Sequence, residues 1–463
     1  MKRSKSDPGA AYPALFSSVA ALGGFLFGYD TAVVNGTIGA LERHFRADPG
    51  RLGFAVASAL LGSAVGAIIA GRVADRAGRV QAMRWTALLF AAGSFGSGIA
   101  ESLITFSIWR FLGGIAVGAA SVIAPAYIAE VAPARIRGRL GSLQQLAIVL
   151  GIFLALAIND LIAHTAGSPD APFWLGVPAW RWMFWVEVLP SALYGGGAFF
   201  VPESPRYLVT RGREKEAAAV LARIGEPEPA ARVAEIRESI GSERPSRLSD
   251  LRAPGGLVLP IVWVGIALSV FQQFVGINVI FYYSTALWHS VGFTEADSMR
   301  ISSITGIINI ATTLIAIAFV DRFGRRPLLL AGSVGMALTL GAMAWLFATA
   351  PRDAAGAPVL PGAHGMAALI AANLYVFAFG FSWGPVVWVL LGEMFNNRIR
   401  GAALALAAAA QWVANWLVTL SFPPLAKAGL GFAYGLYAAA AALSFVFVVR
   451  WVRETKGRTL EQM

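Results

Sequence analysis

Long apolar runs constrain the fold of this chain more than any other feature. They recur along all 463 residues and include the stretches 52–70, 140–158 and 402–420. Each is near the roughly 20 residues that a helix needs to cross the hydrocarbon core of a bilayer. A membrane β-barrel would need strands of about 10 residues with alternating polarity, whereas these runs are continuous and rich in Ala and Leu. Because lipid offers no partner to unpaired backbone groups of an open sheet, the sequence predicts an all-α membrane protein.

The apolar runs predict twelve transmembrane helices, six on each side of a long polar segment, a number typical of secondary carriers. The predicted helices span 13–36, 53–73, 81–101, 103–128, 138–162, 179–201, 257–287, 299–320, 327–349, 364–392, 401–423 and 430–451. The polar segment is rich in Arg, Glu and Ala, which favours short amphipathic helices on the cytoplasmic face. We therefore divide the chain into a cytoplasmic tail 1–12, a six-helix half 13–201, a cytoplasmic helical linker 202–256, a second half 257–452 and a cytoplasmic tail 453–463.

The net charge of +11 is distributed over several clusters of basic residues. These clusters fall at alternate junctions between the predicted helices, as the positive-inside rule requires of a multi-pass protein with both termini in the cytoplasm. The charge therefore reflects topology, and we expect no nucleic-acid partner. The chain has no cysteine, which excludes disulfides, thiol catalysis and iron–sulfur ligation.

Charged motifs repeat between the two halves at a shift of roughly 250 residues, as internal repeats do. Asp75-Arg76-Ala77-Gly78-Arg79 matches Asp321-Arg322-Phe323-Gly324-Arg325. Such a repeat predicts two parallel halves related by an axis along the membrane normal, with binding at their interface. We expect the repeated charges to form a cytoplasmic gate that pairs and separates during transport, although some arginines also set the topology. The predicted gate residues are Asp75, Arg76, Arg79, Glu130, Arg137 and Glu203 and their counterparts Asp321, Arg322, Arg325, Glu393, Arg400 and Glu454.

Several motifs identify a known family. They are GRVADRAGR, RFLGG, PESPR, QQFVGIN, SWGPVVW and the paired R-x-R-G junctions. Together they resemble the sugar porters of the major facilitator superfamily, and most of all the bacterial xylose and glucose proton symporters. One departure is Arg453-Glu454-Thr455-Lys456-Gly457, which lacks the usual proline. The resemblance implies the major facilitator fold, a bacterial inner membrane, a neutral monosaccharide and a proton as substrates, a monomer in the lipid bilayer, and neither cofactor nor metal.

A neutral sugar needs amides, which both donate and accept hydrogen bonds, and flat aromatic faces. Amides lie inside the predicted helices at Gln145, Gln272, Gln273, Asn278, Asn309 and Gln411. On an unbroken helix Gln273 and Asn278 would point roughly 140° apart, so we expect Gly276 to break the helix between them. Gly384 and Pro385 predict a second break before Trp388. The alternative is that membrane amides only bond neighbouring helices.

The resemblance adds further residues to the predicted sugar site. It matches family positions at Gln145, Trp388, Gln411 and Trp412, and Phe27 and Tyr282 are weaker candidates. Ile152 and Phe281 stand where family members specialised for xylose tend to carry Gln and Leu. This pattern favours glucose or another hexose, with xylose as the alternative.

A buried carboxylate predicts proton coupling. Asp30 lies well inside the first predicted helix, where a charge is expensive without a partner or a proton. Arg110 is the expected partner, and Glu187 is positioned to share it. The alternative is a permanent ion pair that only holds two helices together. The sequence therefore predicts a non-enzymatic sugar–proton symporter, with a facilitative uniporter or a non-transporting sugar sensor as the other possibilities.

Overall fold

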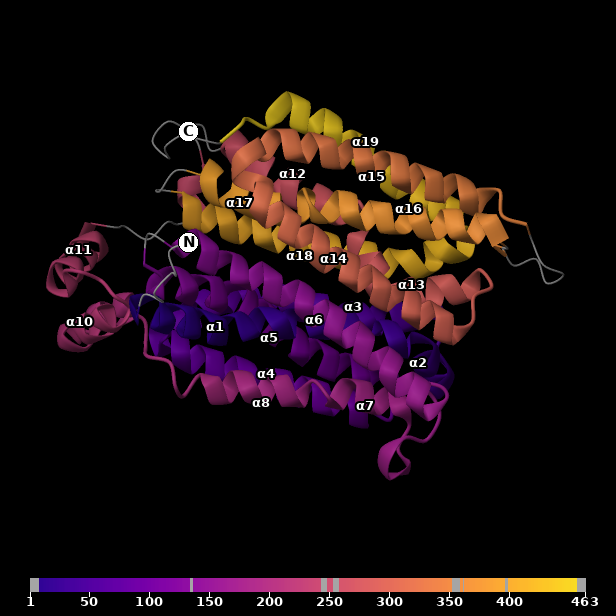
Figure 1. Ribbon diagram of the computed structural model, residues 1–463, viewed down its shortest axis with the longest axis horizontal. Coiled ribbons are helices and arrows are strands. Elements are labelled where there is room, and N and C mark those ends of the chain that lie inside the picture. The colour runs from indigo at the N-terminus through magenta and orange to yellow at the C-terminus, as the bar shows by residue number, and fades with distance from the viewer. Residues whose placement is uncertain are drawn as a thin grey trace, which may run out of the picture.

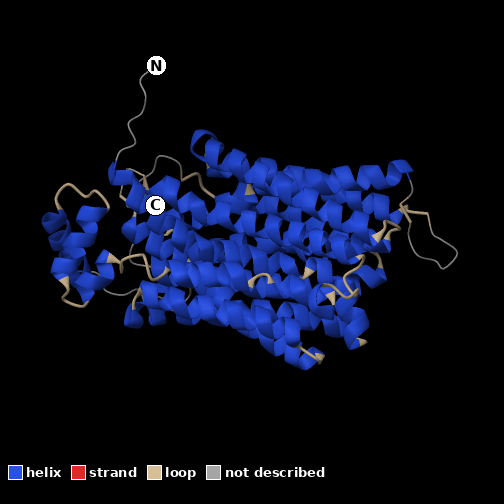
Figure 2. Ribbon diagram, turned by 60° about the horizontal axis from the view of Figure 1, so that its bottom comes forward, coloured by secondary structure: helices blue, strands red, loops and turns tan. Residues whose placement is uncertain are grey.

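The computed structural model describes residues 8–133, 136–242, 248–252, 258–351, 359–360, 362–395 and 399–455. Within these ranges the chain is helical, and its β-pairing is confined to two isolated bridges, Pro172–Pro178 and Arg252–Val258 (Figure 2). The outermost parts of the predicted tails, residues 1–7 and 456–463, lie outside the described ranges, as do 243–247 and 253–257 of the predicted linker.

The first half is built from long helices that cross the molecule from end to end. They are α1 (Pro8–Val33), α3 (Pro49–Ala77), α4 (Arg79–Ile99), α5 (Leu103–Val131), α6 (Arg137–Ala166) and the broken pair α7 (Ala179–Trp185) and α8 (Val188–Gly197). A 3₁₀ turn (Asn35–Thr37) and the short helix α2 (Ile38–Phe45) follow α1. The predicted continuous helix 179–201 is therefore wrong, because the chain turns between Trp185 and Val188 and the helix ends at Gly197.

The second half repeats this organisation. It contains α12 (Pro260–Phe274) and α13 (Ile277–Ser290), α14 (Glu295–Phe323), α15 (Arg325–Ala348), α16 (Gly362–Gly380) and α17 (Trp383–Met394), α18 (Arg400–Ala428) and α19 (Leu430–Trp451). Three short helices connect the halves, namely α9 (Pro205–Thr210), α10 (Glu214–Arg223) and α11 (Pro229–Ser242). The two six-helix halves predicted from the repeat are confirmed (Figure 1).

Ten helical stretches of the described chain are long and apolar enough to cross a membrane by themselves. The two remaining spans have a physical reason to fall short. Helix α4 begins with Arg79 and carries Arg84 together with several Gly and Ser residues, which lowers its mean hydropathy. The α7–α8 pair is interrupted, so neither piece has the length of a span. Large apolar side chains such as Leu88, Ile104 and Leu338 are more than two-thirds exposed, as a lipid-facing surface requires.

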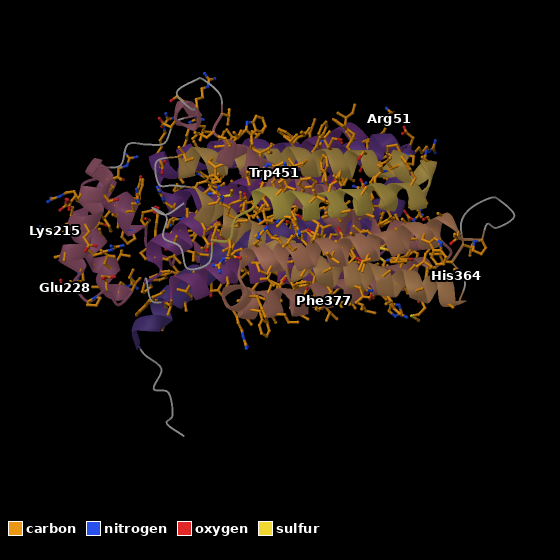
Figure 3. The ribbon with its side chains drawn as sticks, turned by 90° about the horizontal axis from the view of Figure 1, so that it is seen from above. Arg51, Lys215, Glu228, His364, Phe377 and Trp451 are labelled. Carbon is orange, nitrogen blue, oxygen red and sulfur yellow. The ribbon has the colours of Figure 1, made fainter. Side chains whose placement is uncertain are left out.

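The two halves lie side by side, with all long helices running in the long direction of the molecule (Figure 1). Helices α9–α11 extend beyond one end, near both termini, and we call this the linker end. We call the opposite end, where α2 lies, the far end. Lys215 and Glu228 lie at the linker end, whereas Arg51 and His364 lie at the far end (Figure 3). Contacts between the halves join α3 to α18, α6 to α14 and α1 to α13.

Glycines allow the helices of the first half to approach one another closely. An added Cβ at Gly114 of α5 would lie 1.9 Å from the Ala59 carbonyl oxygen of α3, and one at Gly118 would lie 2.0 Å from the Ser63 oxygen. Conversely, an added Cβ at Gly62 of α3 would lie 2.1 Å from the Phe111 carbonyl oxygen of α5. In lipid such close backbone approach replaces the hydrophobic effect as the force that holds helices together.

We expect Gly114→Ala to destabilise the protein by more than about 2 kcal/mol, because the new methyl group collides with a backbone carbonyl that has no room to move. Gly113→Ala is the matched control, since its nearest new contact is 3.6 Å away. Thermal unfolding of the two purified variants in detergent measures the difference. Equal melting temperatures would show that the α3–α5 contact does not depend on this glycine.

Candidate functional site

The break between α12 and α13 lies at Val275–Gly276, as predicted. Gly276 has φ of +82°, and an added Cβ would stand 2.7 Å from the ring of Tyr437. Both facts require glycine at this position. The break leaves the Val275 carbonyl without its helical donor, and the Tyr375 hydroxyl donates to that carbonyl over 2.7 Å. Backbone irregularity inside a membrane protein persists only with such replacement partners.

The break brings three amides of the predicted sugar site into one hydrogen-bonded chain. Asn278 Nδ2 donates to Gln273 Oε1 (2.6 Å), and Gln273 Nε2 donates to Gln272 Oε1 (3.3 Å). Gln272 Nε2 in turn donates to the backbone oxygens of Trp383 (2.9 Å) and Gly384 (3.2 Å). These amides therefore join the interruption between α12 and α13 to the one between α16 and α17.

The second interruption lies earlier than predicted. Ser382, with φ of −131° and ψ of −91°, separates α16 from α17, and Gly384 and Pro385 fall in the first turn of α17. The prediction of a break at Gly384 and Pro385 is thus wrong by about two residues. A proline is tolerated in a first helical turn, because the backbone N–H that it lacks would have no helical acceptor there. Trp383 fixes the turn, since its indole Nε1 donates to Leu329 O (3.0 Å) and Ser333 Oγ (2.9 Å).

The other predicted sugar-site residues take no part in these hydrogen bonds. Trp412 of α18 packs against Phe27 of α1 across the halves, with ring centroids 5.5 Å apart. Gln411 Oε1 is buried and has no hydrogen-bond donor among the described residues. Four further candidates are buried, while Gln145 is half-buried and Trp388 is 40% exposed. The buried four are Ile152, Phe281, Tyr282 and Asn309.

Asp30 and Arg110 form the most buried ion pair of the described chain. Arg110 Nη1 lies 2.6 Å from Asp30 Oδ1, and Arg110 Nη2 donates to the Asp30 backbone oxygen over 3.2 Å. Both side chains are at most 5% exposed. The pair joins α1 to α5. A pair that is so completely desolvated is strongly destabilised when one partner loses its charge.

Glu187 lies at the interruption between α7 and α8 and is fully buried. It is close enough to Asp30 and Arg110 to interact electrostatically with both. Its two carboxyl oxygens have no hydrogen-bond partner among the described residues. The neighbouring Ser94 hydroxyl donates to the Phe90 carbonyl instead, over 2.8 Å. The Glu187 carboxyl group is thus buried near the Asp30–Arg110 pair without a hydrogen bond from the described residues.

Asn35 is a residue that the sequence analysis missed. It follows α1, is 1% exposed, and its Nδ2 donates to Phe281 O and Ser284 Oγ of α13, both at 2.9 Å. Its Oδ1 accepts from the Thr285 N–H at 3.0 Å. In a helix, the N–H of residue 285 and the carbonyl of residue 281 bond to each other. The Asn35 amide therefore binds both groups of one backbone hydrogen-bonding pair in α13, a helix of the other half. An amide inside an apolar stretch was the available signal in the sequence.

The repeated charges form matching clusters at the linker end of each half. Arg79 pairs with Glu130 (3.0 Å) and Arg325 pairs with Glu393 (2.7 Å). Glu203 accepts from the backbone N–H of Arg79 (2.9 Å), and Glu454 accepts from that of Arg325 (3.0 Å). These four contacts lie within one half each. Asp75 also pairs with Arg79 (3.1 Å), and the Arg76 carbonyl accepts from Tyr207. Arg322 is mostly exposed, and the side chains of Arg137, Asp321 and Arg400 lie outside the described part.

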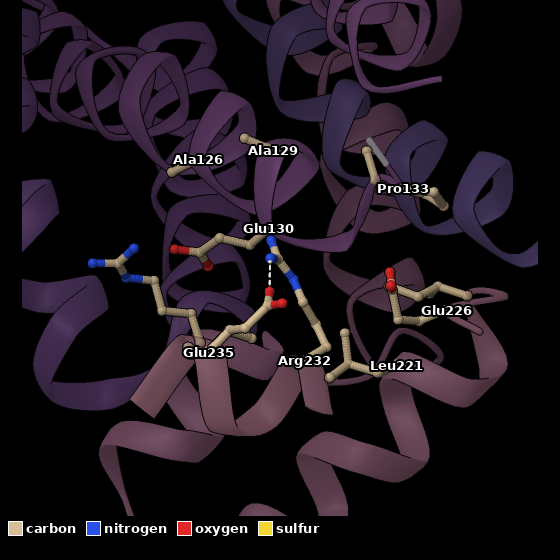
Figure 4. Close-up of a pocket in the computed structure, with 12 residues that line it drawn as sticks. Ala126, Ala129, Glu130, Pro133, Leu221, Glu226, Arg232 and Glu235 are labelled. Atoms are coloured by element: carbon tan, nitrogen blue, oxygen red, sulfur yellow. Dashed lines mark hydrogen bonds and ion pairs between the residues drawn. The ribbon is translucent and has the colours of Figure 1, made fainter. Parts of the chain in front are cut away.

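A cavity of about 680 Å³ adjoins the first of these clusters (Figure 4). It lies between the end of α5 and the linker helices, and Glu130, Arg206, Arg232 and Glu235 are among its lining residues. An ion pair of 2.6 Å joins Arg232 to Glu235 along its wall. The cavity belongs to the linker end and is remote from the amides of α12 and α13.

Comparison with known proteins decides the family. The sequence profile described as "Sugar (and other) transporter" matches residues 16–463. The chain belongs to this family. It is 58% identical to a glucose transport protein of a Synechocystis species over 99% of this chain and 98% of that protein. It is 39% identical to the D-xylose-proton symporter of Escherichia coli K12 over 96% and 94% of the two chains.

A solved structure of a family member supports the fold. The xylose transporter XylE from E. coli, in a partially occluded inward open conformation, superposes with a TM-score of 0.84 at 37% identity, covering 97% of this chain and 100% of that one. The major facilitator fold predicted for this chain is therefore confirmed, and the protein is a multi-pass inner-membrane transporter rather than an enzyme.

We expect Asn35→Ala to increase the population open at the far end by about 5- to 100-fold, because it removes buried hydrogen bonds worth about 1–3 kcal/mol. Asn35→Asp should have the same effect at neutral pH, where a carboxylate oxygen would face the Phe281 carbonyl. At acid pH the protonated side chain can donate again, and the far end should close.

Spin labels on Thr165→Cys of α6 and Ala296→Cys of α14 report this opening as a distance distribution, since the chain has no cysteine of its own. Asn373→Ala is the control, because the Asn373 amide bonds Thr305 within one half (3.1 Å). Unchanged distances in both Asn35 variants at every pH would mean that Asn35 does not hold the halves together.

Proposed function

We propose that this protein is a secondary active transporter that moves a monosaccharide into the cell together with a proton by alternating access. The buried Asp30–Arg110 pair carries this proposal, because it places a proton-accepting group at the centre of a sugar transporter. Its family relatives include a glucose transport protein and a D-xylose-proton symporter. Glucose or another hexose is the proposed substrate, with xylose as the alternative.

The amides and aromatic residues at the interface of the halves are proposed to bind the sugar. Gln411 supports this role best, because a buried acceptor without a donor is costly unless a ligand or water supplies one. The Trp412 and Phe27 rings offer apolar faces from both halves. Gln272 has a different role in this proposal, since its amide is already bonded to two backbone oxygens and holds the helix breaks in place. The remaining proposed sugar-site residues are Gln145, Ile152, Gln273, Asn278, Phe281, Tyr282, Asn309, Gly384 and Trp388.

Proton coupling is proposed to work through competition for Arg110. When Asp30 is ionised, Arg110 is bound to it and α1 is held against α5. A proton on Asp30 cancels this attraction, and Glu187, which interacts electrostatically with Arg110, is proposed to take over the arginine. The released α1 carries Asn35, so protonation can reach the contact with α13 five residues further along the chain. A membrane potential of 100 mV adds about 2.3 kcal/mol per proton to the driving force.

The linker end is proposed to face the cytoplasm, with both termini on that side and the division into tails, halves and linker given above. The basic clusters of that end support this orientation. The charged clusters around Arg79 and Arg325 act as the cytoplasmic gate in this proposal, because they join helix ends that can rearrange when the halves move. We propose that the protein works as a monomer within the lipid bilayer.

We expect Asp30→Asn to abolish proton-driven accumulation of labelled glucose in proteoliposomes, while exchange of sugar down its gradient continues. The reason is that asparagine cannot take up a proton and leaves Arg110 permanently free. Uptake under an imposed inward proton gradient, with glucose and xylose in parallel, is the measurement. Wild-type protein that merely equilibrates sugar regardless of pH would identify a facilitator. Sugar binding without any movement would identify a sensor.

We expect Gln411→Leu to lower sugar affinity by about 10- to 100-fold and to leave the melting temperature of the sugar-free protein unchanged or higher, because it removes an unpaired buried polar group. Gln272→Leu should lower the melting temperature instead, since it removes the buried hydrogen bonds from α12 to the start of α17 and leaves the Gln273 amide without its acceptor. Titration of sugar against intrinsic fluorescence, together with thermal unfolding, separates the two effects. Normal affinity in Gln411→Leu would exclude Gln411 from the sugar site.

A further inference from the structure

The segment 167–178, which connects α6 to α7, presents an apolar tip to its surroundings. Trp174 is 65% exposed and Leu175 is 78% exposed. Leu175 has φ of 58° and ψ of 22°, a left-handed conformation that leucine rarely adopts. The segment projects sideways from the bundle next to α7 in Figure 1, across the long direction of the helices. A strained backbone that holds a leucine outward indicates an apolar partner beyond the protein itself.

Part of the backbone of this tip is hydrogen-bonded internally. The N–H of Phe173 donates to Val177 O (2.9 Å), and the N–H of Val177 donates to Trp174 O (3.3 Å). The indole Nε1 of Trp182 also donates to Trp174 O (3.0 Å). Prolines at 169, 172 and 178 reduce the number of donors further. Only backbone that is paired in this way can enter an apolar medium at low cost.

The tip continues into the lipid-facing surface of the first half through stacked aromatic rings. The Trp174 ring lies 5.1 Å from that of Trp182, which lies 5.1 Å from that of Trp185. Trp185 stacks on Phe95 of α4 at 5.9 Å. Phe95 is about half exposed, on the outer face of a predicted membrane span. The aromatic stripe therefore runs from the tip onto the surface that lipid covers.

The position of the tip along the membrane normal follows from the length of the next span. Helices α7 and α8 extend from Ala179 to Gly197, about 28 Å at 1.5 Å per residue. This length is close to the roughly 30 Å of the hydrocarbon core. The residues just before Ala179 therefore lie at the boundary between acyl chains and headgroups, where tryptophan is favoured because its ring is apolar and its N–H is polar.

We propose that Trp174 and Leu175 insert into the headgroup boundary of the far-end leaflet, so that segment 167–178 anchors the first half to the lipid surface. The same segment carries Asp170, which accepts a hydrogen bond from Arg43 Nε (2.6 Å). Arg43 also reaches Glu295 of the second half (3.6 Å). The anchor thus connects the lipid surface to an ion pair that closes the far end between the halves.

The test uses a spin label at Leu175→Cys in the otherwise cysteine-free protein, reconstituted into phospholipid vesicles. Collisions with oxygen, which concentrates in the bilayer, should exceed collisions with a water-soluble nickel chelate by several fold. Ala296→Cys, at the same end on the exposed start of α14, is the control and should show the reverse preference. A label at Leu175 that is as accessible to nickel as the one at Ala296 overturns the proposal. The proposal is also overturned if the Leu175 label is protected from nickel only at high protein density and loses this protection when the protein is diluted into excess lipid. A second copy of the chain would then cover the tip.

A second measurement does not depend on a label. Lipids brominated near the headgroup should quench more tryptophan fluorescence in the wild type than in Trp174→Phe, and the difference should shrink for lipids brominated near the chain ends. Leu175→Asn keeps a residue that tolerates the left-handed conformation and removes the apolar side chain. We expect this variant to reduce the quenching assigned to Trp174. Equal quenching in all three proteins would show that the tip stays in water.

Discussion

The scarcity of hydrogen-bond partners in lipid is the constraint on which the rest of this structure depends. Each interruption of a helix exposes backbone groups that water cannot satisfy, so another part of the chain has to supply a partner. The Val275 carbonyl receives the Tyr375 hydroxyl, and the Gln272 amide holds α12 against the start of α17 by donating to the carbonyls of Trp383 and Gly384. The polar groups that accumulate around these repairs are those that a sugar requires. Helix breaks and the proposed binding site therefore have a common physical origin.

Helix α1 connects the proposed sites for the two substrates. Its inner part holds Asp30 against Arg110, and Asn35, just beyond its end, bridges the backbone of α13 in the other half. Phe281, whose carbonyl Asn35 contacts, is itself a proposed specificity residue. In the proposed mechanism, a change of charge at Asp30 acts on α13 through the short stretch of chain that joins Asp30 to Asn35. The glycine contacts of α3 with α5 pack these two helices of the same half closely together.

The charged clusters at the linker end illustrate how a duplicated sequence produces a duplicated interaction. The Arg79–Glu130 and Arg325–Glu393 pairs, each flanked by a glutamate that binds backbone N–H groups, have the same arrangement in both halves. The far end has no such symmetry. There Asn35 and Arg43 of the first half bind α13 and α14 of the second. Polar contacts therefore join the two halves at the far end, whereas the two ion pairs at the linker end each lie within one half.

The sequence by itself determined the class of fold, the two halves, the break at Gly276 and the identity of the buried charges. Each of these follows from a local property, such as span length, a repeated motif, a glycine between two amides or a carboxylate in an apolar run. Only the tertiary structure decided that the second break lies at Ser382, that Gln272 binds backbone rather than open space, and that Asn35 joins the halves. The bonds of Gln272 and Asn35 depend on groups from helices more than a hundred residues away, and the turn at Ser382 depends on the bonds of Trp383 to Leu329 and Ser333, 54 and 50 residues away. Residue spacing along one helix carries no information about such partners.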